Sequence, residues 1–193
     1  MSLAEITLAL MVTSALSAVV SPVIGDYVSD ARRVQTASDL NMLSVTFTRF
    51  SNDARMAETA ARHWLRQDIL VGDGLAPAVA PGIDAAWTGE SGHNRVGRLD
   101  DHLQSNAAGY ETASAGPAAF GARGWRGPYL SPGIKPDAWG HRYVMNVASW
   151  SQRRWALVVL SAGPNGIIDT PFDMPGAAPG GDDLIAIVAP IGH

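Results

Sequence analysis

The chain has 193 residues, a formal net charge of −4 and no cysteine. The lack of cysteine excludes a disulfide framework, a thiolate metal site and a cysteine nucleophile. Lys135 is the single lysine among 14 basic residues, and the arginines form no cluster that could neutralise phosphates, so nucleic acid is not an expected partner. The length indicates one domain plus an appendage.

The first 25 residues form an almost uncharged segment. Residues 6–25 carry no charge, and Glu5 stands directly before them. A run of 20 mostly apolar residues is long enough, as a helix, to cross the hydrocarbon core of a bilayer. A carboxylate near the start of a helix gains about 0.3–1 kcal/mol from the helix dipole, but in lipid it needs a partner. The nearest cation is the α-amine of Met1, in the same or an adjacent copy, so we expect Glu5 to have a role in assembly.

Two other interpretations of this segment remain open. A secretory signal peptide is disfavoured because no basic residue precedes the apolar run. A plain membrane anchor would need only apolar side chains, whereas this segment contains several hydroxyl residues, which let helices approach one another closely. They are Thr7, Thr13, Ser14, Ser17 and Ser21.

Helical signals continue beyond residue 25. Residues 26–50 contain neither glycine nor proline, and an apolar stripe recurs at three- and four-residue spacing. The stripe consists of Leu40, Leu43, Phe47 and Phe50. The sequence thus predicts one helix of about 50 residues, kinked or melted near Pro22 and Gly25. Residues 51–53 predict the end of this helix. The chain would then consist of a spine helix over 1–52 and a head domain over 53–193. Within the spine helix, residues 1–25 would form the membrane or filament core and residues 26–52 an amphipathic part.

The head is predicted to start with helices and to end with strands. A helix over 54–70, a Gly- and Pro-rich loop over 72–97 and a short helix over 98–104 come first. The β-rich runs 142–148, 155–160 and 184–189 predict strands, and the last two are separated by a 23-residue loop over 161–183. The fold class is therefore α+β: a long N-terminal helix packed on a small globular domain with a C-terminal antiparallel sheet of about three strands and long loops.

Two regions of the chain carry a family resemblance. Glu5 and Pro22 stand at positions five and 22, and residues 124–144 read GWRGPYLSPGIKPDAWGHRYV. The segments VVLSAGPNGIIDT and GGDDLIAIV follow. Together they resemble the type IV pilin superfamily, and within it the major pseudopilin of type II secretion systems. Ala138 replaces the usual proline of an Asp-Pro-Trp-Gly turn, Met1 replaces the usual phenylalanine, and residues 54–120 lie outside the match.

The resemblance implies a structural role without enzymatic activity. The chain would be a subunit of a type IV pilus-like or type II secretion pseudopilus filament, polymerising through its N-terminal helix, with Met1, Glu5 and Pro22 as assembly residues. Met1 would be either a processed, methylated end or the initiator methionine, and the family register of Glu5 and Pro22 favours the processed end. The implied partners are further copies in a helical homopolymer, the bacterial inner membrane before assembly, the assembly machinery and a prepilin peptidase. The assembled filament would be periplasmic or at the cell surface.

The resemblance also implies a calcium site in the loop over 161–183. Its ligands would be Leu160, Ser161, Asn165, Asp169, Asp182 and Asp183. Calcium takes six to eight oxygen ligands, and this loop is rich in oxygen-bearing side chains. No EF-hand pattern is present, however, so the residues by themselves favour a solvated acidic turn. Asn165 stands where the family often has an acid, which removes one charge from the site.

A second hypothesis is a non-polymeric single-pass membrane protein with a calcium-dependent periplasmic or extracellular binding domain. An anchored periplasmic enzyme is a third, and it has little support. The five histidines are far apart, no His-x-x-x-His pair exists, and no Gly-x-Ser-x-Gly motif is present.

Overall fold

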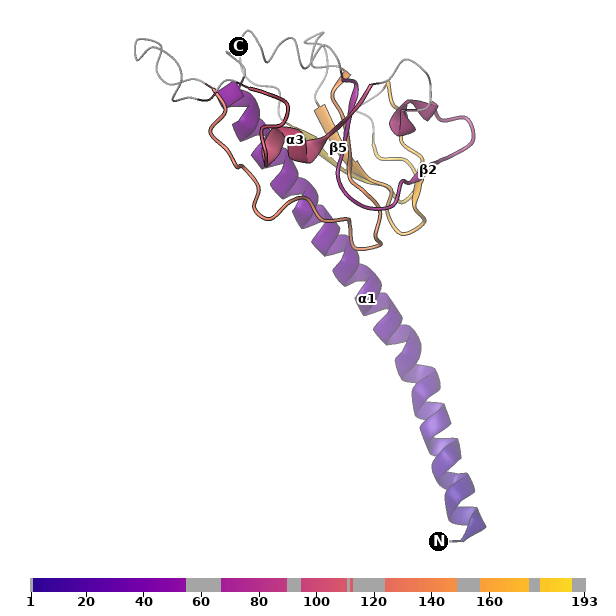
Figure 1. Cartoon of the computed structure of the whole chain (residues 1–193). Helices are drawn as coiled ribbons and strands as arrows, with labels where there is room; N and C mark the ends of the chain where they lie inside the picture. Colours follow the sequence, from indigo (N-terminus) through magenta and orange to yellow (C-terminus); the bar gives the residue numbers. More distant parts are fainter. Residues whose placement is uncertain are drawn as a thin grey trace. The chain divides into compact units, whose positions relative to one another are not determined.

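The computed structural model describes residues 2–54, 67–89, 95–110, 112, 124–148, 157–173 and 178–188, with the backbone alone at 19–22 and 54. The chain divides into two compact units, residues 1–35 and residues 36–193. The second unit contains the C-terminal part of the long helix α1, a mixed β-sheet and several loops, so the α+β class is confirmed (Figure 1).

Helix α1 spans Leu3–Ala54. It ends close to the predicted stop at residues 51–53, within the usual uncertainty of helix ends. The backbone is helical through Pro22 and Gly25, so the helix is not melted there in the single chain, and the loosening expected in the assembled state stays a prediction. One missing N–H donor removes only one backbone hydrogen bond, and the turns on both sides stay helical.

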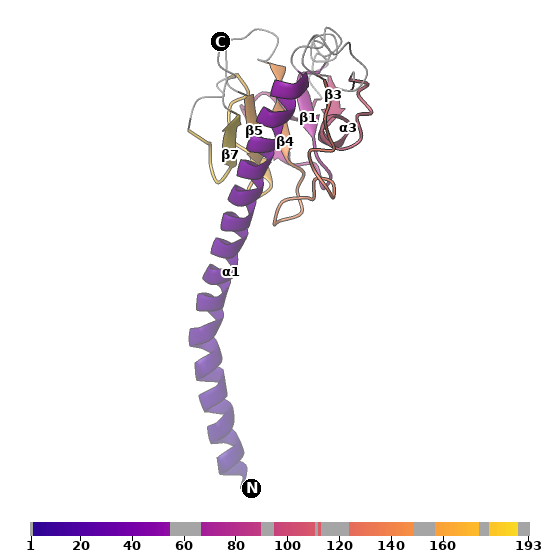
Figure 2. The same cartoon turned by 90° about the vertical axis from the view of Figure 1, so that its left-hand side faces the viewer.

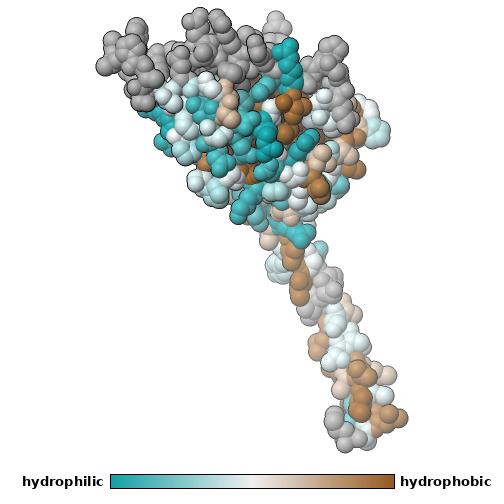
Figure 3. Space-filling model, viewed as in Figure 1, coloured by the Kyte–Doolittle hydropathy of each residue, from teal (hydrophilic) through white to brown (hydrophobic). Residues whose placement is uncertain are grey.

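The first unit, residues 1–35, contains the apolar part of α1 and the charged residues that follow it. This helix is long and apolar enough to cross a membrane, and its most apolar stretch is not buried within the chain. Large apolar side chains are exposed all along it, for example Leu3 (81%), Leu8 (65%) and Met11 (69%). Figure 3 shows hydrophobic side chains, in brown, exposed along the segment toward the N-terminus.

The second unit is held together by the apolar stripe of α1. Leu40, Leu43, Phe47 and Phe50 are each at most 1% exposed. They belong to one core cluster with side chains of the sheet such as Leu70. Figure 2 shows this part of α1 running across the face of the sheet. The predicted stripe is therefore confirmed as the contact between helix and sheet.

The main sheet has five strands in the order β3-β1-β4-β5-β7. Its strands are β1 (Ile69–Val71), β3 (Val96–Arg98), β4 (Val144–Asn146), β5 (Leu157–Ser161) and β7 (Leu184–Val188). Strands β1 and β3 are parallel, and the other neighbours are antiparallel. The three predicted strands correspond to β4, β5 and β7, which are adjacent as expected.

The sheet extends beyond the predicted three strands. The helix predicted over 54–70 is wrong at its C-terminal end, because Ile69 and Leu70 lie in strand β1. Residues 55–66 of this predicted helix lie outside the described residues. The predicted loop over 72–97 contains β2 (Ala78–Val79), the short helix η1 (Ala85–Thr88) and most of β3. Strands of two or three residues are too short to show an alternating pattern in the sequence, so pairing with neighbouring strands determines where they form. Helix α3 (Leu99–Leu103) confirms the short helix predicted over 98–104.

A second, smaller core lies beside the loop over 161–183. Strand β6 (Ile167–Ile168) pairs in parallel with β2, so the predicted loop is not wholly irregular. Trp87 of η1 is 1% exposed, and its indole N–H donates to the carbonyl oxygen of Thr170 over 2.7 Å. This bond ties the loop to the head and positions the carboxylates described next.

Candidate functional site

Asp183 organises the loop that joins β5 to β7. Its side chain is buried, with the residue 4% exposed. Its Oδ2 accepts hydrogen bonds from the backbone N–H of Asp169 (2.9 Å), the backbone N–H of Thr170 (2.8 Å) and the hydroxyl of Thr170 (2.6 Å). One carboxylate oxygen therefore holds two consecutive residues that precede it by 13 and 14 positions.

Asp182 joins a different part of the same loop. Its Oδ2 accepts a hydrogen bond of 3.2 Å from the backbone N–H of Asn165. The other oxygens of the two neighbouring carboxylates, Oδ1 of Asp182 and Oδ1 of Asp183, are buried and have no hydrogen-bond partner. A buried, unpartnered carboxylate oxygen is energetically unfavourable until a hydrogen-bond donor, a water molecule or a cation satisfies it.

Glycines allow the backbone to approach these carboxylates closely. Gly163 (φ 62°) and Gly181 (φ 51°) adopt the left-handed conformation that other residues rarely take. A β-carbon at Gly163 would collide with the carbonyl oxygen of Asp182, and one at Gly181 would collide with the carboxylate of Asp169. The glycines of this loop are therefore required by its compact path around the acids.

A second buried carboxylate, Asp137, lies at the start of the loop. The hydroxyl of Ser161 donates to its Oδ2 over 2.6 Å. The backbone N–H groups of Trp139 and His141 donate to its Oδ1 over 3.0 and 2.8 Å. Asp137 thus closes its own turn and fixes the end of β5. Asp137 is the aspartate of the Asp-Ala-Trp-Gly turn and was not among the predicted site residues.

Burial raises the pKa of the Asp183 carboxyl above its ordinary value. The hydrogen bonds from Thr170 and from the two backbone N–H groups act in the opposite direction, and the nearby charge of Asp169 raises the pKa again. The ionised form is thus disfavoured by its surroundings despite three hydrogen bonds. A cation beside Oδ1 would compensate for this desolvation.

The structure brings several of the predicted ligands into one loop. Asn165, Asp169, Asp182 and Asp183 are linked by the contacts described above. The side chain of Asn165 also caps its own turn, since its Oδ1 accepts from the backbone N–H of Ile167 over 2.6 Å. The hydroxyl of Ser161 is directed to Asp137, and Leu160 is a buried residue of β5. Thr170, the main partner of Asp183, has no distinguishing signal in the sequence.

The donor set fits a hard cation only in part. Across the described residues, no group of three or more His, Asp or Glu side chains is arranged to hold a metal ion. The unpartnered oxygens of Asp182 and Asp183 supply two donors of the right chemistry. Calcium takes six to eight oxygens, so backbone carbonyls and water would have to provide the others.

The predicted assembly residues lie in the first unit. Met1 lies outside the described residues. Glu5 forms a reciprocal pair with Ser2: the Ser2 backbone N–H donates to Oε2 of Glu5 over 2.8 Å, and the Glu5 backbone N–H donates to the Ser2 hydroxyl over 3.3 Å. Pro22 lies in the helical backbone of α1. The side chain of Glu5 is therefore engaged at its own helix start in the single chain.

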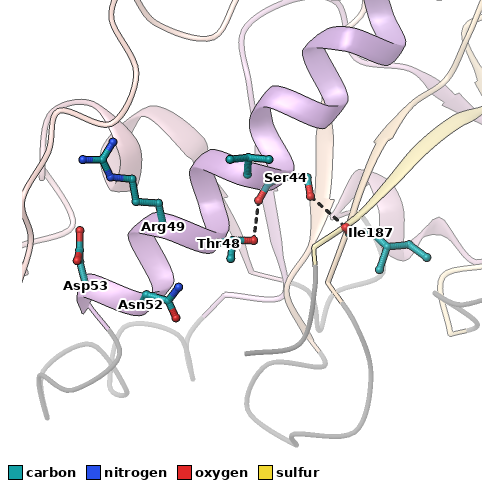
Figure 4. Close-up of a pocket in the computed structure, with 7 residues that line it drawn as sticks. Ser44, Thr48, Arg49, Asn52, Asp53 and Ile187 are labelled. Carbon is teal, nitrogen blue, oxygen red and sulfur yellow. Dashed lines mark hydrogen bonds between the residues drawn. The ribbon is translucent and has the colours of Figure 1, made fainter. Parts of the chain in front are cut away.

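A groove of about 480 Å³ runs beside the C-terminal part of α1 (Figure 4). Its lining combines exposed Val45 and Ile187 with the polar residues Arg49 and Asn52. The Ser44 hydroxyl donates to the carbonyl oxygen of Ile187 over 3.0 Å and so attaches the edge strand β7 to the helix. Arg49 and Asp53 are the ionisable residues of its lining.

Comparison of the chain with protein-family models, curated proteins and solved structures found no match. The class of protein is therefore defined by the fold and the site alone. It is an α+β protein with one N-terminal helix that is long and apolar enough to cross a membrane.

Proposed function

We propose that this chain is the structural subunit of a type IV pilus-like or type II secretion pseudopilus filament, and that it polymerises through its N-terminal helix. The observation that carries the proposal is the apolar segment of the first compact unit: large apolar side chains are exposed around the helix over residues 6–25, and Glu5 is the single charged side chain before residue 26. Such a surface has to be covered by lipid or by other copies of the chain.

Lipid and neighbouring copies would cover the apolar segment at two successive stages of filament assembly. Lipid covers the segment while the subunit is in the inner membrane, and neighbouring helices cover it in the filament. Burial of apolar surface supplies roughly 25 cal/mol per Å² in water. The Thr and Ser residues of the segment let the helices approach closely. Glu5 would neutralise the α-amine of Met1 in a neighbouring copy, because an unpaired carboxylate is unfavourable in an apolar bundle. Pro22 would let the helix loosen during assembly.

We propose that calcium orders the loop over 161–183 in the head. The buried, unpartnered Oδ1 atoms of Asp182 and Asp183 support this role. The other proposed calcium ligands are Asn165, Asp169 and the carbonyl oxygens of Leu160 and Ser161. The ion would neutralise two adjacent carboxylates and stabilise a loop whose ordering is entropically unfavourable.

Electron microscopy of sheared cell-surface material tests the proposed filament. Long, high-mass fibres that contain this chain and sediment without detergent are the expected result. The alternative, a non-polymeric single-pass membrane protein with a calcium-dependent binding domain, shares the membrane helix and the calcium loop. That protein would require detergent for extraction and would run as a small particle, which would refute the filament.

A further inference from the structure

The segment of α1 that follows the apolar run has a charge pattern that is complementary to itself. Asp26, Asp30 and Arg33 are all exposed. They form no ion pair within the described part of the chain. In an α-helix, residues seven apart are separated by about 10.5 Å along the axis and by only about 20° around it. Asp26 and Arg33 therefore lie on one face, two turns apart.

The same seven-residue spacing relates two exposed apolar side chains. Tyr27 is 72% exposed and Val34 is 70% exposed, the highest values among the large apolar residues between 17 and 40 for which side chains are described. They lie directly beside Asp26 and Arg33 in the sequence and follow the same geometry. An exposed aromatic ring and an exposed valine two turns apart form a second pair that a single chain leaves uncovered.

We propose that this face binds a second, parallel copy of the chain displaced by seven residues, about 10.5 Å, along the helix axis. At this offset Asp26 of one copy lies opposite Arg33 of the other, and Tyr27 lies opposite Val34. With no offset, Asp26 would face Asp26 and Arg33 would face Arg33, which is repulsive. The offset rests on the proposed function in one respect: copies inserted in one membrane share their orientation, which makes the helices parallel.

The displacement gives the contact a direction. Each copy presents Asp26 and Tyr27 to one neighbour and Arg33 and Val34 to another. A contact that does not close on itself adds copies without limit, as a filament requires. The residues just beyond the apolar segment would therefore set the axial distance between neighbouring copies.

Disulfide cross-linking of full-length chain in membranes and in sheared material tests the offset directly, because the chain has no native cysteine. Residues 27 and 34 of one helix are about 10.5 Å apart, too far for an internal disulfide. The double variant Tyr27→Cys/Val34→Cys should form a ladder of covalent multimers. The matched single variants Tyr27→Cys and Val34→Cys should remain monomeric.

Charge reversal in the double-cysteine background tests the ion pair. Asp26→Arg or Arg33→Asp should each lower the ladder by about two- to fivefold, the range expected for an exposed pair. The combined reversal should restore it. Arg32→Asp is the matched control, since it changes the net charge equally but lies about 100° away around the helix, and it should have little effect.

The outcomes separate the offset from the filament. Dimers in the single-cysteine variants would mean an unstaggered contact and would overturn the offset. Fibres without a ladder would also overturn it while leaving the filament intact. A ladder in membranes without any sheared fibre would support the offset and refute the filament.

Discussion

Ser2 and Glu5 form a capping box at the start of α1, in which each residue accepts the other's backbone N–H, over 2.8 and 3.3 Å. This arrangement satisfies two of the N–H groups that a helix start leaves unpaired. Glu5 therefore has a local structural role in the single chain, beside the assembly role proposed for its charge. The two roles make different predictions.

The first prediction separates the charge of Glu5 from its capping role. Glu5→Gln keeps an acceptor for the Ser2 N–H but removes the charge, whereas Ser2→Ala keeps the charge and weakens the cap by about 0.5–2 kcal/mol. We expect Glu5→Gln and Glu5→Leu to insert in the membrane and to give much less sheared filament. Ser2→Ala should give nearly the wild-type yield. A wild-type yield from Glu5→Gln would show that the charge is not required.

The second prediction concerns calcium and Asp183. In full-length chain in detergent, calcium should raise the thermal midpoint and a chelator should lower it. At a calcium concentration 100 times Kd, the gain is about 2.7 kcal/mol. Asp183→Asn keeps hydrogen-bond acceptors but loses the charge, so the calcium response should disappear. Asp173→Ala removes an exposed acid of the same loop and should retain the response. A midpoint insensitive to the chelator in the unmodified chain would exclude the site.

The third prediction concerns alkaline stability. Burial raises the pKa of Tyr129 to about 12, and its hydroxyl donates to Asp53 Oδ2 over 3.1 Å. The unfolded value is about 10, so the folded state keeps the proton longer. The stabilisation is fully present below pH 10 or so and is lost as the pH rises through about 12. Tyr129→Phe cannot ionise, so its stability should fall less over this range, as measured by urea unfolding. If the free energy of unfolding fell equally with pH in the unmodified chain and in Tyr129→Phe, the raised pKa of Tyr129 would be contradicted.

The fourth prediction concerns the contact between helix and sheet. Phe50 is fully buried and packs edge-on against Phe47, Tyr110 and Tyr129. Phe50→Ala should destabilise the head by about 3–5 kcal/mol. Val45→Ala, on the exposed side of the same helix, should change stability by less than about 0.5 kcal/mol. Tryptophan fluorescence during urea unfolding reports on the head alone, because all six tryptophans lie beyond residue 63. Similar losses for both variants would contradict the packing.

Local patterns were sufficient to predict the long helix and the central strands. The stripe from Leu40 to Phe50 has the period of a helix, and the runs around Val144, Val159 and Ala186 are β-branched and bounded by turns. Each of these signals depends only on neighbours in the chain. The loop over 161–183 was also recognisable, because it is long and rich in Gly, Pro, Asp and Asn, including the neighbouring Asp182 and Asp183.

Tertiary contacts decided the remaining features. Ile69–Val71 could continue a helix by its composition, but it becomes a strand because β3 and β4 pair with both of its edges. Ser161 donates to Asp137, 24 residues away, and no local pattern connects them. The Oδ1 atoms of Asp182 and Asp183 are buried in the folded chain, which no local pattern predicts. Sequence periodicity reports backbone preference, whereas strand pairing, buried hydrogen bonds and desolvation arise between segments that meet only in the folded chain.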